Sequence, residues 1–188
     1  PNDAAEISDM FFAASASERA QILHNLQETP LKAAARIPPA RAARAIHILE
    51  MAAFAEDLDN FTLELGEALI LPSRIAADVV NDPGGEPIAC AMRALDVSSA
   101  AFQRILMFLN PEAGSSVNYV YRLSRLYDRL SERSALVMLA AWRGSTMAVA
   151  RATYRSALYD GERPASTQTR SSVQPGSAAA IRNQKSGS

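Results

Sequence analysis

Residues 61–85 read FTLELGEALILPSRIAADVVNDPGG, and this stretch decides the fold class. Its apolar residues recur at helical spacing on both sides of Pro72. The proline separates two segments, because the residue before a proline is disfavoured in helical geometry. The run from Asn81 to Gly85 then predicts a tight turn. The stretch therefore predicts two short helices that each bury one face, and nothing in it alternates as a strand does.

The same pattern extends outward in both directions, and the composition agrees with it. Aromatic residues make up only 6% of the chain and alanine is abundant, which favours closely packed helices over a sheet. We expect an all-α fold of short helical hairpins, packed as a HEAT-like solenoid or as an irregular bundle. Helices are expected over residues 3–14, 15–28, 38–56, 61–71, 73–81, 87–95, 98–109, 116–130, 131–142 and 146–159.

Two segments are expected to lack helices. Residues 29–37 are interpreted as a linker that ends at Pro38 and Pro39. Residues 161–188 are rich in Ser, Gln, Gly and Thr and poor in large apolar residues, so they are expected to form a disordered tail. The predicted organisation is one all-helical domain over residues 1–160 followed by that tail.

Several classes of protein are disfavoured by composition. No apolar run reaches 18 residues, so no transmembrane helix is expected. Asp3, Glu6 and Asp9 lie where a signal peptide would need basic residues. Cys90 is the single cysteine, which excludes an internal disulfide and suits a reducing compartment. We therefore expect a cytoplasmic protein without a membrane association.

The net charge of −1 conceals an asymmetry along the chain. Residues 1–117 hold 8 basic and 16 acidic groups, whereas residues 118–188 hold 11 basic and 4 acidic groups. The C-terminal part could therefore bind an anionic partner, or the two parts could attract each other or simply face solvent.

Four groups of residues resemble an uncharacterised bacterial domain-of-unknown-function family of all-helical, HEAT-like repeat proteins. They are residues 10–15 (MFFAAS) with Glu18-Arg19 and Ile22-Leu23, residues 81–87 (NDPGGEP), residues 103–111 (QRILMFLNP), and Val120-Tyr121 with Leu126-Tyr127-Asp128. They span about residues 7–143 and resemble the C-terminal part of that family. The resemblance implies a helical fold and a bacterial cytoplasmic setting, and it supplies no catalytic residue.

Residue types that usually carry catalysis or bind metals are sparse and scattered. His24 and His47 lie on different expected helices, without the spacing of a zinc site. Cys90 lies among apolar residues, where a thiol packs as a small hydrophobe with a raised pKa. We expect no cofactor, no metal and no enzymatic activity.

The clearest surface signal is a series of arginines: Arg122, Arg125, Arg129 and Arg133. At helical spacing they form one stripe beside an apolar face, although Asp128 could neutralise part of it. The stripe could be an ordinary solvated face, a site for an acidic protein or a site for nucleic acid.

Tyr121 falls off the apolar face and is expected to be exposed beside this stripe. Tyrosine and arginine are both enriched among the residues that anchor interfaces. The leading hypothesis is a non-enzymatic scaffold or adaptor that binds a protein partner through these residues. The alternative is a nucleic-acid-associated regulatory protein that uses the same basic face. The sequence leaves the oligomeric state open.

Overall fold

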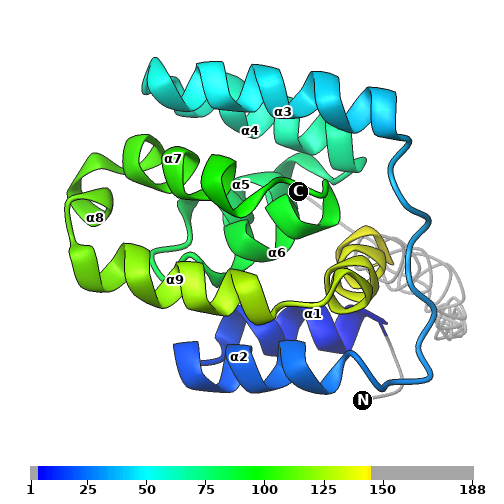
Figure 1. Cartoon of the computed structure of the whole chain (residues 1–188). Helices are drawn as coiled ribbons and strands as arrows, with labels where there is room; N and C mark the ends of the chain where they lie inside the picture. The colour runs from blue at the N-terminus through cyan, green and yellow to red at the C-terminus, as the bar shows by residue number, and fades with distance from the viewer. Residues whose placement is uncertain (1–3, 145–188) are drawn as a thin grey trace, which may run out of the picture.

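The computed structural model describes residues 4–144, and all regular secondary structure in that range is helical (Figure 1). The helices are α1 (Ala4–Ala13), α2 (Ala16–Asn25), α3 (Pro39–Phe54), α4 (Leu58–Leu69), α5 (Ser73–Asn81), α6 (Glu86–Ala94), α7 (Ser99–Leu109), α8 (Pro111–Gly114) and α9 (Val117–Arg129). A further helix occupies residues 132–144. This confirms the all-α prediction; the expected helix over 146–159 and the tail over 161–188 lie outside the described residues.

Most helix boundaries follow from capping residues. Ser15 and Glu18 form the capping box expected at the start of α2, with the Ser15 amide donating to the Glu18 carboxylate at 2.8 Å. Asp57 accepts a hydrogen bond from the Asn60 amide at 3.0 Å, so α4 begins three residues earlier than the sequence predicted. The short helix α8 was not predicted, because Pro111 marks a helix start as readily as a stop.

The helices form an irregular array in which segments distant in sequence pack together. Figure 1 shows the α1–α2 hairpin at one end of the array and the α3–α4 pair at the other. Helix α3 contacts α7, α6 contacts α9, and α2 contacts α6. Residues 26–38 cross from one end to the other along one side, as the predicted linker requires.

The core is built from large side chains of several helices. Phe102 stacks on Tyr127, with ring centroids 4.1 Å apart, which joins α7 to α9. Trp142 packs against Phe11 and Phe12, which joins the helix of residues 132–144 to α1. The same helix accepts a hydrogen bond from the linker and donates one to α4, so it connects both ends of the array.

No helix within residues 4–144 combines the length and the apolar character needed to cross a bilayer.

Candidate functional site

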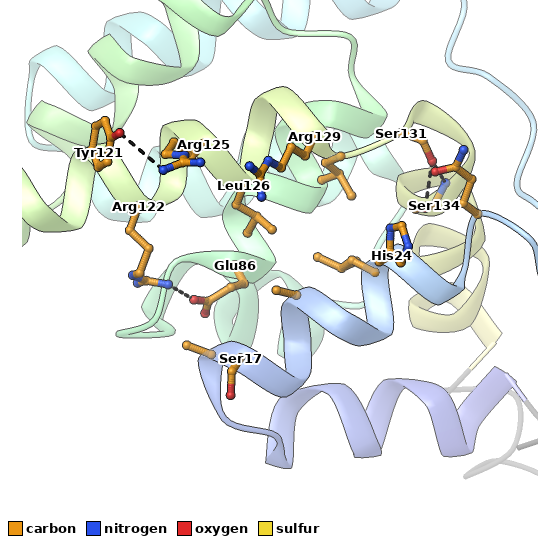
Figure 2. A pocket seen from close by; sticks show the side chains of 15 residues that line it. Ser17, His24, Glu86, Tyr121, Arg122, Arg125, Leu126, Arg129, Ser131 and Ser134 are labelled. Carbon is orange, nitrogen blue, oxygen red and sulfur yellow. Dashed lines mark hydrogen bonds and ion pairs between the residues drawn. The ribbon is translucent and has the colours of Figure 1, made fainter.

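A groove of about 690 Å³ lies between helices α2 and α9 (Figure 2). Helix α2 lines it with Ala20 and Leu23, and the opposite wall carries Leu126 and Leu130. Arginines of α9 border this apolar surface: Arg122, Arg125 and Arg129, with Tyr121 beside them. We call this site the α2–α9 groove. It combines apolar area with positive charge, and three of the four predicted arginines line it.

The amphipathic sequence of α9 places these arginines. Ser116 caps the helix by accepting a hydrogen bond from the Tyr119 amide at 3.4 Å. Leu123 and Tyr127 are buried on the inner face, so residues 122, 125 and 129 must lie toward the outside. Tyr121 is 60% exposed, as predicted, because it lies off the buried face.

Arg122 is anchored in a buried ion network. Its guanidinium pairs with Glu86, which is fully buried, and donates to the carbonyl of Gly84 at 2.6 Å. Glu86 also pairs with Arg19 at 3.2 Å, and Arg19 pairs with Asp82 at 2.7 Å. A buried carboxylate of this kind is tolerated because it is paired and hydrogen-bonded. Arg122 therefore fixes α9 to the α5–α6 turn as well as lining the groove.

Arg19 joins this network to the α1–α2 hairpin. Its guanidinium donates to the carbonyls of Phe11 and Phe12, both at 2.9 Å, at the end of α1. Burial alone lowers the pKa of Arg19, but hydrogen bonds and charge attraction to Asp82 and Glu86 outweigh it and the pKa is raised. The guanidinium is therefore firmly charged and joins three helices beneath the groove.

The α5–α6 turn depends on a glycine. Gly85 has φ +81°, in the left-handed region, and a Cβ there would lie 2.4 Å from Leu123 and 2.5 Å from the Tyr119 hydroxyl. The Asp82 carboxylate accepts the amide of Gly85 at 3.2 Å, which closes the turn predicted from the sequence. Because the turn lies so close to α9, Glu86 lies within ion-pair distance of Arg122.

Arg125 and Arg129 are exposed, and neither has a carboxylate partner among the described residues. Arg125 lies over the ring of Tyr121, 5.6 Å from its centroid, and donates weakly to its hydroxyl at 3.5 Å. Asp128, which could have neutralised the stripe, instead accepts from Ser99 at 2.8 Å. The charge on this edge of the groove is therefore available to a ligand.

Arg133 lies apart from the other three. Helix α9 ends at Arg129, so Arg133 belongs to the next helix and does not continue the stripe. Its guanidinium donates to the linker carbonyls of Gln27 at 3.1 Å and Thr29 at 2.8 Å. The structure therefore gives Arg133 a role in holding the linker and does not bring it to the groove.

Sequence reasoning missed three residues of the site. Glu86 and Arg19 lie within the motifs that resemble the family, but nothing local predicts that they approach each other across 67 residues. His24 lines the α2 side of the groove, and the sequence had shown only that it lacks the spacing of a zinc site. Cys90 is fully buried as expected, and burial raises its pKa.

Comparisons with known proteins identify the family and nothing finer. Neither the curated proteins nor the solved structures include a match. Residues 1–140 match the family described as "Uncharacterised protein conserved in bacteria (DUF2336)". That range is well over half of the chain and includes the groove, the network beneath it and all four groups of family-like residues. The chain therefore belongs to this bacterial family of uncharacterised, conserved proteins.

Proposed function

We propose that this protein is a non-enzymatic, cytoplasmic scaffold or adaptor that binds an acidic, amphipathic helix of a protein partner in the α2–α9 groove. One observation carries the proposal: two exposed arginines without carboxylate partners in the described chain border an apolar groove. A helix laid in such a groove would bury its apolar face against Ala20 and Leu126, which are both half-buried.

Arginine suits this role better than lysine does. Its planar guanidinium holds a carboxylate through two hydrogen bonds, so Arg125 and Arg129 can orient an acidic helix. Tyr121 supplies a rigid, exposed ring beside them. The apolar surface would provide most of the affinity, and the arginines would select for acidic partners.

The non-enzymatic part of the proposal rests on the groove's chemistry. Glu86, the carboxylate that lines it, is held by Arg19 and Arg122 and is therefore poorly placed to accept a proton from a substrate. The cytoplasmic setting rests on the buried, unpaired thiol of Cys90. HEAT-like repeat character, and a position in the C-terminal part of the family, stay predictions.

Site-specific photo-crosslinking tests the groove directly. A photoreactive residue replaces Ser17, which is exposed and lines the groove on α2, and the full chain is irradiated in lysate of the bacterium that encodes it. We expect a cross-linked protein that survives nuclease treatment. Reversing Arg125 and Arg129 to Glu should reduce this product at least about tenfold, because two charge-assisted contacts become repulsive.

A matched control distinguishes an effect of the groove from an effect of the protein's net charge. Arg44→Glu with Arg74→Glu makes the same charge change on α3 and α5, where both side chains are exposed, and should leave the product intact. Circular dichroism should show unchanged helicity in both double variants. Equal cross-linking in the groove and control variants would refute the site, and a product lost with nuclease would favour the nucleic-acid alternative.

A further inference from the structure

A second hollow, of about 470 Å³, lies between helices α1 and α5 and shares no lining residue with the α2–α9 groove. Its apolar surface comes from Phe12, which is half-buried, and from Ile75, which is buried. Its charged lining consists of three aspartates and one arginine: Asp9, Asp78, Asp82 and Arg74. We call this site the α1–α5 hollow. Its volume is that of a site for a small ligand.

Ser8 also lines the α1–α5 hollow, and its hydroxyl is a buried polar group without a hydrogen-bond partner. The residue is only 1% exposed, and its Oγ makes no hydrogen bond with any other group of the chain. A serine within a helix often returns its hydroxyl to the carbonyl four residues earlier, but Ser8 does not. Native proteins leave few buried polar groups unsatisfied, because each one costs stability. This hydroxyl is therefore available to a ligand that enters the hollow.

The aspartates of the hollow differ in how firmly their charge is held. Asp82 is fixed by its buried pair with Arg19 at 2.7 Å. Asp78 pairs with Arg74 at 3.5 Å, but the Arg74 and Asp78 side chains are 70% and 42% exposed, and such a pair contributes little. Asp9 is exposed and has no ion-pair partner among the described residues. The hollow therefore offers the carboxylates of Asp9 and Asp78 to a cation.

The chemistry of the hollow suits an organic cation. No three carboxylate, imidazole or thiol groups of the described residues lie close enough together to hold a metal ion. We propose that the α1–α5 hollow binds a primary alkylammonium group. The three N–H donors of the ammonium head match the Ser8 hydroxyl and the carboxylates of Asp9 and Asp78, and the alkyl chain packs on Phe12 and Ile75. A free diamine and a lysine side chain of a partner both carry this group.

Titration of the isotope-labelled full-length protein, followed by NMR, tests the proposal. The probes are cadaverine, the methylamide of Nα-acetyl-lysine, and the uncharged diol that corresponds to cadaverine. Both amines should bind with a Kd of about 1 mM or tighter and shift the amide signals of α1 and α5, whereas the diol should not bind. Tighter binding of cadaverine identifies a free diamine as the ligand, and tighter binding of the lysine derivative identifies a side chain. If neither amine binds, or if the diol binds equally well, the proposal is wrong.

Two double variants with the same charge change test where the ammonium group lies. Asp9→Asn with Asp78→Asn should weaken cadaverine binding at least about tenfold, because two charge-assisted contacts lose their charge. Asp59→Asn with Asp96→Asn makes the same change at exposed positions outside the hollow, and should leave the affinity unchanged. Equal losses in the two variants would show that cadaverine responds only to net charge, and the site would be refuted.

Ser8→Ala distinguishes a binding role of the hydroxyl from a structural one. The change removes a buried group without a partner, so the thermal stability of the variant should equal or exceed that of the wild type. Its affinity for cadaverine should nevertheless fall about threefold or more, because one hydrogen bond to the ligand is lost. An unchanged affinity would contradict the proposal. The α2–α9 groove is tested by separate residues, so either proposal can fail without the other.

Discussion

Arg19→Met removes the centre of the buried network while keeping most of the side chain's apolar volume. The Arg19 side chain, only 9% exposed, loses its ion pairs with Asp82 at 2.7 Å and Glu86 at 3.2 Å. The carbonyls of Phe11 and Phe12 lose their donors at the same time. Removing one partner of a buried ion pair costs about 3–5 kcal/mol, because the remaining charge stays buried. We expect a loss of that size in the free energy of unfolding.

Urea unfolding followed by circular dichroism measures this loss, and an exposed ion pair supplies the control. Arg36 pairs with Glu132 at 2.5 Å, but its side chain is 76% exposed. Arg36→Met should cost no more than about 1 kcal/mol, because exposed ion pairs contribute little. The reasoning is refuted if Arg19→Met costs as little as this control.

A double-mutant cycle tests the mechanism. In the wild type, Glu86→Gln leaves Arg19 with Asp82 but weakens two ion pairs. In the Arg19→Met background, Glu86→Gln neutralises a buried carboxylate that has already lost one partner. It should therefore lower the free energy of unfolding by less than it does in the wild type. The coupling should be about 0.5–3 kcal/mol, as for residues in one ion network. Strict additivity would show that Arg19 acts through Asp82 and the two α1 carbonyls and not through Glu86.

Four further predictions concern other parts of the fold. Gly85→Ala should cost about 2–4 kcal/mol by urea unfolding, through left-handed strain and overpacking against α9. Gly66→Ala should instead stabilise by about 0.5–1 kcal/mol, because it lies within α4 and its Cβ would meet Ala76 at an ordinary 3.4 Å. Burial raises the pKa of Tyr127 to about 12 from 10.0, so the stabilisation that this hydroxyl contributes should be constant below about pH 10 and fall between about pH 10 and 12. Tyr127→Phe should reduce the alkaline loss in urea unfolding, and the loss that remains includes that of Tyr119, whose pKa burial also raises. Cys90 should resist thiol alkylation in the native protein and react only on unfolding, as followed by mass spectrometry.

The sequence predicted where several residues that line the groove lie on α9. Helical spacing placed Arg122, Arg125 and Arg129 on one face of α9 and left Tyr121 exposed, because these positions follow from the periodicity of a single helix. The same reasoning extended the stripe to Arg133, but the chain turns after α9 and redirects that side chain to the linker. A periodic argument holds only within one uninterrupted helix.

The groove itself could not be derived in this way. Its two walls come from α2 and α9, which are separated by about ninety residues in sequence and meet only because α2 contacts α6 and α6 contacts α9. Glu86 and Arg19 gave no separate signal, since a charged residue in a local sequence is usually solvated. Their pairing becomes visible only when the turn at Gly85 brings them together.

The sequence by itself determined the all-α class, the linker and most helix boundaries, because prolines, capping residues and 3.6-residue periodicity act over a few neighbouring positions. Only the tertiary structure decided which arginines are held in ion pairs and which remain available. Arg122 meets a buried carboxylate of another helix, whereas Arg125 faces the groove with no such partner among the described residues. That difference depends on contacts between helices, and contacts between distant segments are set by packing of the whole core rather than by local propensity.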